Sequence, residues 1–278
     1  MRIGGAALLI LIFIAMTAPL LGTVDPSLFD AASRDLRPGE AGEIVNFDGD
    51  TIKHVFLMGS DSYGRDIYSR VIYGTRVSLL VGLCSALAAL AFGIVCGLSA
   101  GYIRWLDGLL MRVMDGIMAI PAILIAIALV ALWRASLTTV IFAIAIPEIP
   151  RVTRLVRSLV LTLREEPYVE AAVSLGTPTA KIMFGHILPN TVAPLIVQGT
   201  YIVGFSILIE AILSFLGVGL PPDIPTWGNI MAEGRVQFVA YPHNVFFPGI
   251  FLAATVLAVN ILGDGLRDTL DPKMAKRV

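Results

Sequence analysis

The chain has 278 residues, of which 56% are hydrophobic and 15% are charged, and its mean hydropathy is +0.83. This composition is typical of a protein that crosses a membrane several times and excludes an ordinary soluble domain. The formal net charge of −1 gives no electrostatic basis for binding nucleic acid, which is therefore not an expected partner.

The first expected element is a membrane-spanning helix over residues 3–24, which carry no charge and are numerous enough to cross a bilayer. We interpret it as a retained span, because it is longer than the apolar part of a typical signal peptide and no small-x-small cleavage site follows. Residues 25–76 are polar, and their turn-rich first half is expected to be irregular. The second half is expected to form an interfacial helix, because Tyr63, Ile67 and Val71 lie one helical turn apart.

The second expected span is the uncharged run over residues 77–103. Small side chains recur at every fourth position within it, which places them on one helix face and allows another helix to approach closely. This packing stripe consists of Ser85, Ala89, Gly93, Gly97 and Gly101. Its end also matches the G-x-S-x-G pattern of hydrolases, but that pattern requires a preceding strand and a His and an acid. We therefore interpret the stripe as a helix-packing surface.

Four further spans are expected. Residues 116–133 form the third, with a kink at Pro121. The fourth is the weakest, because residues 135–147 are too short to cross a bilayer without residues 152–163 as a continuation. The fifth and sixth are residues 191–220 and 245–263.

Arginine and lysine residues are concentrated in the short loops on one side of this arrangement, which predicts that both termini face the cytoplasm. That side carries Arg2, Arg104, Arg112, Arg151, Arg154, Arg157, Arg164, Lys181, Arg267, Lys273, Lys276 and Arg277, whereas the opposite short loops carry Arg134 and Arg235. We expect an all-α polytopic membrane protein with six transmembrane helices. Residues 1–76 contribute the first span, an extracytoplasmic loop and an interfacial helix. Residues 77–278 form a five-helix core with a loop at residues 165–190 and a short cytoplasmic tail.

The polar segment between the fourth and fifth spans has the pattern of two short helices joined by a bend. Pro167 fits the first turn of a helix, and Gly176 fits the left-handed residue that ends it. Thr177 and Pro178 fit the N-cap and first position of a second helix, which Pro189 is expected to end. A capped pair of helices in the longest cytoplasmic loop predicts a surface that is presented to a partner.

The chain lacks the residue patterns of an ATPase or a metalloenzyme. It contains no G-x-x-x-x-G-K-[ST] phosphate loop, and its histidines are isolated from one another and from the cysteines. We therefore expect no catalytic residue, no cofactor and no metal on this chain. Glu210 is the one charge deep within an expected span, where insertion costs about 2.5–3.5 kcal/mol. It is either a residue of a transport pathway or a hydrogen-bonding link to a neighbouring span.

The loop at residues 165–190 resembles the "EAA" loop of permease subunits of bacterial ATP-binding-cassette importers. The residues that match are Glu170, Ala171, Ala172, Gly176, Ile187, Leu188 and Pro189. Further matches resemble the dipeptide/oligopeptide/nickel branch of that family, and within it the second type of permease subunit. They lie at residues 59–66, 73–78, 111–115, 186–190, 210–217, 227–228 and 260–272.

The resemblance implies an importer of several subunits in the bacterial cytoplasmic (inner) membrane. Its expected partners are a homologous second permease, two ATPase subunits that bind ATP and Mg, an extracytoplasmic substrate-binding protein, and membrane lipid. In such importers the EAA helices dock in a groove on an ATPase subunit. We expect closure of the ATPase pair to move residues 165–190 as a lever, which passes the motion into the fifth span and drives alternating access.

Peptides are the commonest cargo of the branch that this chain resembles, and nickel chelates, glutathione and opine-like solutes are the alternatives. Two functions from other classes are an ion-coupled secondary transporter and a membrane scaffold that only anchors partners. A secondary transporter is expected to hold several buried ionisable groups within its spans, whereas the apolar runs here contain essentially Glu210 alone. The importer interpretation is therefore preferred.

Overall fold

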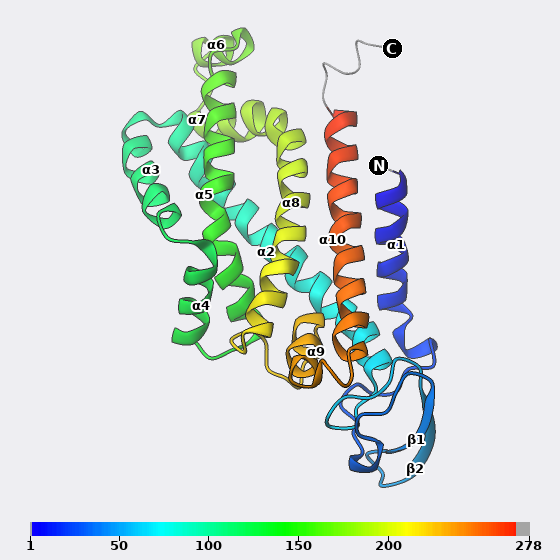
Figure 1. Ribbon diagram of the computed structural model, residues 1–278. Coiled ribbons are helices and arrows are strands. Elements are labelled where there is room, and N and C mark those ends of the chain that lie inside the picture. Colours follow the sequence, from blue (N-terminus) through cyan, green and yellow to red (C-terminus); the bar gives the residue numbers. More distant parts are fainter. Residues whose placement is uncertain (1, 271–278) are drawn as a thin grey trace.

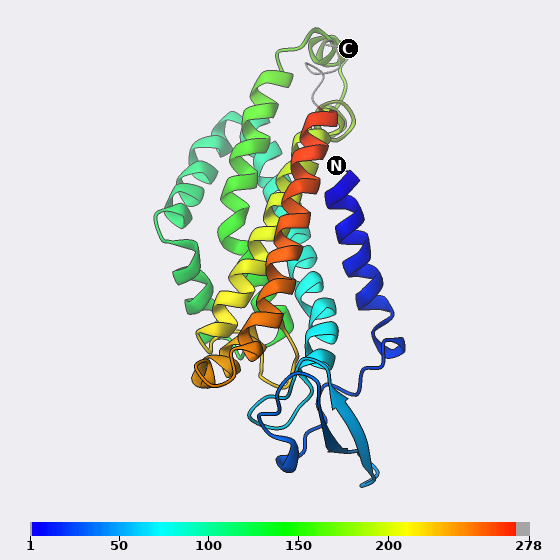
Figure 2. The ribbon, with the colours of Figure 1, turned by 45° about the vertical axis from the view of Figure 1, so that its right-hand side comes forward.

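The protein is an elongated bundle of helices with a small β-hairpin at one end (Figures 1 and 2). The computed structural model describes residues 2–270, so the tail with Lys273, Lys276 and Arg277 lies outside the described residues. The longer helices are α1 (Arg2–Met16), α2 (Ile67–Tyr102), α3 (Arg104–Met118), α5 (Leu137–Leu163), α8 (Leu188–Phe215) and α10 (His243–Leu270). The shorter ones are α4 (Ala122–Leu132), α6 (Pro167–Ser174), α7 (Thr179–Lys181), the π-helix η3 (Ile182–Ile187) and α9 (Trp227–Gly234).

Within the described residues, three helices are long and apolar enough to cross a membrane. They are α2, α10 and the continuous helix Thr179–Phe215, which joins α7, η3 and α8. A fourth crossing is possible if α3 and α4 act as one bent span. α1 is apolar but has only 15 residues, because Pro19 lies in a 3-10 turn that follows it. The first helix therefore ends before the predicted residue 24.

The third expected span is broken rather than kinked. α3 ends at Met118, α4 begins at Ala122, and the two helices are bent by 87°. Pro121 has an extended ψ of 131° at the start of α4. A proline offers no backbone N–H and disfavours helical geometry in the residue before it, which explains why the break lies here.

α5 is one continuous helix of 27 residues that contains both Pro147 and Pro150. The predicted joining of residues 135–147 to residues 152–163 is therefore confirmed as a helix. Its middle and second half carry Glu148, Arg151, Arg154 and Arg157, so it does not count among the apolar spans. Its arginines lie on a helix of the bundle, not in a loop beyond it.

Residues 25–66 form a compact unit at the start of α2, which we call the hairpin cap. Strands β1 (Glu40–Val45) and β2 (Thr51–Phe56) pair in antiparallel fashion, and Gly49, with φ of +85°, lies in the turn between them. Leu28, Ile44 and Phe56 form a small core inside the unit. This half of the polar segment was expected to be irregular. The difference arises because a tight turn at residues 46–50 allows the flanking residues to pair.

The segment expected to be an interfacial helix is the first part of α2. Asp66 caps α2 by accepting a hydrogen bond from the backbone N–H of Ser69. Ile67 and Val71 are fully buried, and they pack with Trp227 of α9. These apolar residues face protein and not a membrane surface, because α9 folds back over them. The expected boundary between residues 76 and 77 falls inside this helix.

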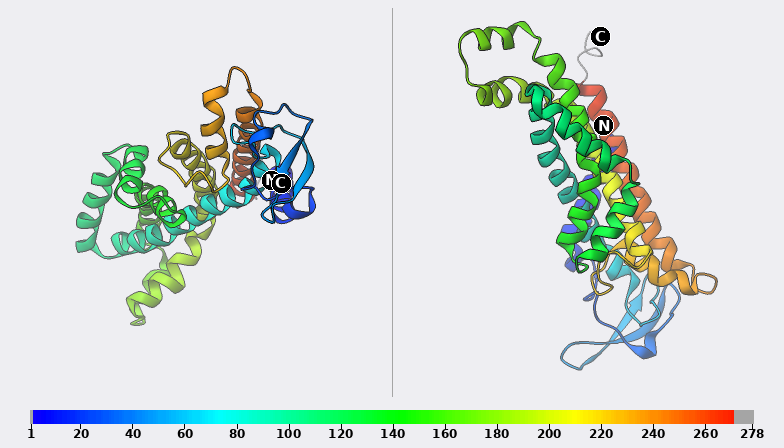
Figure 3. Two further views of the ribbon diagram at one scale, coloured as in Figure 1. Left: turned by 90° about the horizontal axis from the view of Figure 1, so that it is seen from below. Right: turned by 90° about the vertical axis from the view of Figure 1, so that its left-hand side faces the viewer.

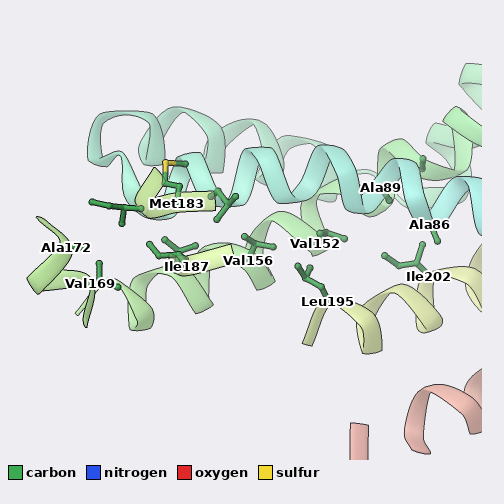
Figure 4. Packing of buried hydrophobic residues seen from close by; sticks show 14 residues of the cluster. Ala86, Ala89, Val152, Val156, Val169, Ala172, Met183, Ile187, Leu195 and Ile202 are labelled. Carbon is green, nitrogen blue, oxygen red and sulfur yellow. The ribbon is translucent and has the colours of Figure 1, made fainter. Parts of the chain in front are cut away.

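The hairpin cap and the α3–α4 pair lie on opposite sides of the bundle, and the 165–190 loop projects from the end remote from the cap (Figure 3). The largest buried cluster runs along α2, α5 and α8 from Ala86 and Ile202 to Val169 and Ala172 (Figure 4). The loop at residues 165–190 is thus part of the same core as the long helices.

Candidate functional site

The first half of the 165–190 loop is α6, and its end is built as the sequence predicts. Pro167 occupies the first turn of α6, and Gly176 has a φ of +75°. The backbone N–H of Thr177 donates to the carbonyl of Ala172, and that of Gly176 donates to the carbonyl of Val173. These two bonds form a Schellman motif, which ends a helix through a left-handed residue.

The second half of the loop differs from the prediction. Pro178, not Thr177, is the N-cap of α7. The prediction that Pro189 ends the helix is wrong, because α7 continues through the π-helix η3 into α8, and Pro189 lies in the first turn of α8. The backbone N–H of Leu188 bonds to the carbonyl of Met183, five residues earlier. Such a widened turn accommodates the proline ring without ending the helix.

One face of the loop is buried and the other is open. Val169, Ala172, Ile182, Met183 and Ile187 belong to the main core (Figure 4). Leu188 is half-buried, whereas Glu170, Ala171, Gly176 and Pro189 are exposed. The exposed face also carries three large apolar side chains, Val173, Leu175 and Phe184, and Leu175 is 85% exposed.

Two side-chain contacts fix the loop relative to the helices. The guanidinium of Arg164 donates to the carbonyl of Gly101 at the end of α2, at 3.2 Å. The amide nitrogen of Asn190 donates to the hydroxyl of Tyr168 on α6 at 3.2 Å and to the carbonyl of His186 at 2.8 Å. The first contact holds the end of α5 against α2, and a displacement of α6 would act on α8 through Tyr168 and Asn190.

The small residues of α2 lie against α5. A Cβ atom built on each of three glycines would clash with a valine of α5, and the pairs are Gly93 with Val152, Gly97 with Val156 and Gly101 with Val160. The separations from the valine Cβ atoms are 2.5, 2.5 and 2.6 Å. Ala89 is fully buried, and the hydroxyl of Ser85 donates to the carbonyl of Ile141 on α5 at 3.3 Å. This face thus lets two long helices approach closely.

Glu210 is fully buried in α8. Its Oε1 accepts a hydrogen bond from the hydroxyl of Ser214, one turn later on the same helix, at 2.8 Å. The side chain of Thr226, just before α9, lies close to the same carboxyl, and Oε2 has no hydrogen-bond partner among the described residues. Glu210 lines neither of the two cavities described below.

Because Glu210 makes only these local contacts, we expect Glu210→Gln to leave solute uptake unchanged. Glutamine keeps an acceptor for Ser214, so the free energy of unfolding should change by no more than about 1 kcal/mol. Uptake by the assembled protein in vesicles and its unfolding temperature are the two measurements, with Ser214→Ala as the matched variant. Loss of uptake in a normally assembled Glu210→Gln protein would instead identify a pathway residue.

Two of the cavities among the described residues lie between the long helices. One, of about 760 Å³, lies between α1, α2, α8 and α10 and is lined almost entirely by apolar side chains. The other, of about 630 Å³, lies between α5, α8 and α10. Its lining includes Asn190, Gln198 and Arg267. The sequence gives no periodic signal for this second cavity, because its polar groups come from helices that are far apart in the chain.

A further polar cluster was not predicted. Arg70 of α2 and Arg65 of the hairpin cap both contact Asp61 and Glu233, and Glu233 belongs to α9. The structure holds no group of three or more His, Cys, Asp or Glu side chains arranged for a metal ion within residues 2–270. The cluster is thus an ion-pair network that links the hairpin cap to α9.

The sequence is similar to a protein family and to several permease proteins. Residues 89–276 match the model of the family described as "Binding-protein-dependent transport system inner membrane component". The "Probable peptide ABC transporter permease protein" of Sinorhizobium fredii is 46% identical over 275 residues, which are 99% of this chain and 89% of that protein. The dipeptide transport system permease protein DppC of Alkalihalophilus pseudofirmus is 43% identical, covering 95% of this chain and 82% of that protein.

Other relatives are described as glutathione permeases. The glutathione transport system permease protein GsiD of Pectobacterium atrosepticum is 45% identical over 218 residues, which are 78% of this chain and 72% of that protein. Among solved structures, the methionine ABC transporter MetNI in an inward-facing conformation contains a similar chain. That likeness has a TM-score of 0.61 at 17% identity and covers 74% of this chain and 98% of the other. At this identity it supports the fold alone.

Proposed function

This chain belongs to the family of binding-protein-dependent transport system inner membrane components, and we propose that it forms half of the translocation pathway of an ATP-driven peptide importer. The family is one of permease subunits, which work with ATPase subunits, a partner permease and a binding protein. The chain is accordingly an inner-membrane protein, and ATP and Mg would be bound by the ATPase partners. An ion-coupled carrier acting alone has no support from the relatives.

The observation that carries the mechanism is the construction of the 165–190 loop. Its inner face belongs to the main core, whereas Glu170, Ala171 and Gly176 are open together with the apolar Val173 and Leu175. An exposed apolar patch on an otherwise fixed segment is typical of a docking surface. We assign this surface to an ATPase subunit.

The continuous helix from Thr179 to Phe215 connects the 165–190 loop to the apolar layer, so a movement of the loop could be transmitted along it. A displacement of α6 would reach α8 through the Tyr168 and Asn190 contact and through the buried side chains of Ile182 and Ile187. The π-helix η3 is the point where this helix is most easily rewound, because its wider turn is less stable than an α-turn. Closure of the ATPase pair would in this way tilt α8 and switch access.

The proposed topology has six crossings, with α1, α2, α3–α4, α5, α8 and α10 as the membrane elements. Both termini and the 165–190 loop would face the cytoplasm. α1 begins and α10 ends towards the end of the bundle that carries α6, which supports this orientation (Figure 1). The hairpin cap would then face the binding protein on the other side.

Peptides are the proposed cargo, because the relatives from Sinorhizobium and Alkalihalophilus are described as peptide and dipeptide permeases. Glutathione is itself a peptide with two carboxylates, so the GsiD relatives are compatible with the same chemistry. Nickel chelates remain the alternative cargo within the same architecture.

The lever is tested by Gly176→Val. Gly176 has a φ of +75° but no atom within 4 Å of a built Cβ, so valine would strain the bend by about 1–2 kcal/mol without a clash. We expect uptake to fall and ATP hydrolysis to become independent of loaded binding protein, measured in vesicles with the complete complex.

Gly217→Val is a matched control, because it places valine at a similar left-handed backbone position. Its φ is +80°, and a Cβ there also meets no atom within 4 Å, but it follows α8 at the opposite end of the bundle. Gly217→Val is expected to retain coupling. If ATP hydrolysis stays coupled to uptake in both Gly176→Val and Gly217→Val, as in the original protein, the lever is refuted. Uptake of peptides by the original complex is a separate test, and it tests the proposed importer function.

A further inference from the structure

An arginine of α5 lies within the thickness of the apolar layer. Val152 packs against Gly93 of α2, since a Cβ on Gly93 would lie 2.5 Å from it. At 1.5 Å per residue, Gly93 is about 25 Å from Arg76 and about 14 Å from the end of α2 at Tyr102, and residues 77–103 are uncharged. Arg151, next to Val152, is therefore at membrane depth, although its charge predicted a place in a cytoplasmic loop.

The side chain of Arg151 is held in a fixed position yet remains 43% exposed. Its Nη1 donates to the buried carboxylate of Glu148 at 3.0 Å. Its guanidinium carbon lies 5.4 and 5.7 Å from the ring centroids of Tyr201 and Phe205 on α8, and these two rings stack on each other. Nε and Nη2 have no hydrogen-bond partner within residues 2–270 and are free to donate.

An exposed charge at this depth does not face lipid. A charged side chain in the centre of a bilayer costs about 2.5–3.5 kcal/mol, so such groups face protein or a water-filled route. The exposed side of Arg151 borders the groove between α5 and α8, because its guanidinium packs against the rings of Tyr201 and Phe205 on α8.

The cavity of about 630 Å³ lies between the same two helices and α10, one turn from Arg151. Leu155 of its wall is one helical turn from Arg151, and Val197 is one turn from Tyr201. Further along, Gln198 contributes an amide nitrogen that is buried without a partner among the described residues, and Arg267 lines the cavity in the last turns of α10. Arg151, Gln198 and Arg267 thus follow one another along the groove and the cavity.

We propose that the α5–α8 groove selects anionic cargo, with the guanidinium of Arg151 binding a carboxylate of the passing solute. A guanidinium with two free donors matches the two oxygens of a carboxylate. Glu148 offsets part of the positive charge, which keeps binding weak enough for the solute to move on towards Gln198 and Arg267. This inference rests on the proposed transport function and adds a determinant of specificity inside the membrane.

The first test asks whether water reaches the groove. Arg151→Cys is made in a Cys84→Ser, Cys96→Ser background, because both native cysteines are partly exposed. Inside-out vesicles with the complete complex are treated with a negatively charged, impermeant methanethiosulfonate reagent. We expect Arg151→Cys to be modified and Phe142→Cys to be spared, because residue 142 lies two and a half turns away, on the opposite face of α5. If both are spared, a neighbouring chain covers the groove and the proposal is overturned.

The second test measures selectivity. Uptake of the tripeptides Ala-Glu-Ala and Ala-Lys-Ala is compared for the original complex and for Arg151→Gln, Arg151→Lys and Arg151→Glu. All complexes receive cargo from one binding protein, so its own preference cancels when the uptake ratios are compared.

Loss of a charged hydrogen bond is expected to lower the ratio of Ala-Glu-Ala to Ala-Lys-Ala uptake about tenfold in Arg151→Gln. The ratio should be kept in Arg151→Lys and should fall further in Arg151→Glu. Arg154→Gln removes a charge one turn away that pairs with Asp115 of α3, and it is expected to keep the ratio. An unchanged ratio in Arg151→Gln and Arg151→Glu overturns the proposal. If the original complex imports neither peptide, the proposed peptide function fails, and the labelling result alone decides whether the groove is an open route.

Discussion

Replacing Gly97 with leucine is expected to prevent the protein from folding, because α2 and α5 touch at this residue. A Cβ at position 97 would lie 2.5 Å from the Cβ of Val156 and 2.8 Å from the carbonyl oxygen of Thr153. Overpacking costs about 1–3 kcal/mol where side chains can move aside, and here one obstacle is backbone, so the loss should exceed this range. The yield of monodisperse protein in detergent and its unfolding temperature measure the effect.

Gly108→Leu is the matched control for this substitution. Gly108 is an exposed residue of α3, and a Cβ there has no neighbour within 4 Å. Glycine is less favourable than leucine in a helix by up to about 1 kcal/mol, so Gly108→Leu should be neutral or slightly stabilising. Equal yields and unfolding temperatures for the two variants would contradict the close approach of α2 and α5.

Removing the charge of Arg70 is expected to be the second large effect. Arg70 is 1% exposed, and its Nη1 donates to Asp61 at 2.7 Å and to Glu233 at 2.6 Å. In Arg70→Met, Arg65 alone would face both carboxylates. Breaking a buried ion pair by removing one partner costs about 3–5 kcal/mol, because a charge is left without compensation.

The loss in Arg70→Met is measured as a fall in unfolding temperature and as faster proteolysis of the hairpin cap. The double variant Arg70→Met, Glu233→Gln should recover part of the stability, because it removes the uncompensated charge. Arg34→Met serves as the control, since Arg34 is an exposed arginine of the same cap. Equal unfolding temperatures for Arg70→Met and Arg34→Met would show that the ion-pair network between the hairpin cap and α9 does not stabilise the protein.

The bend in the 165–190 loop illustrates what a short stretch of sequence is able to predict. Gly176 takes the left-handed backbone conformation and Pro167 the first turn of α6, because both preferences come from the residue's own covalent structure. Pro189 shows the limit of the same reasoning. A proline removes one hydrogen bond, but whether the helix ends or widens depends on the core that Ile182, Met183 and Ile187 join.

The α5–α8 groove illustrates what short stretches do not predict. Arg151 looks like a loop residue by charge, yet its depth depends on the contact of Val152 with Gly93 in another helix. In the same way, Arg65 and Glu233 are 168 positions apart and form a contact only after the hairpin cap and α9 have folded together. No local pattern encodes such contacts, because they depend on how distant helices are placed.

The sequence by itself determined the membrane class, the apolar runs, the stripe of small residues on α2 and the bend at Gly176, since hydropathy, helical period and backbone preference are properties of neighbouring residues. The tertiary structure decided that the polar segment before α2 folds as a hairpin cap and that α3 and α4 meet at 87°. It also decided that Glu148 and Arg151 lie on a helix packed within the bundle and not in a loop. These outcomes follow from the packing of helices that are distant in the chain, where burial and desolvation outweigh the local preferences.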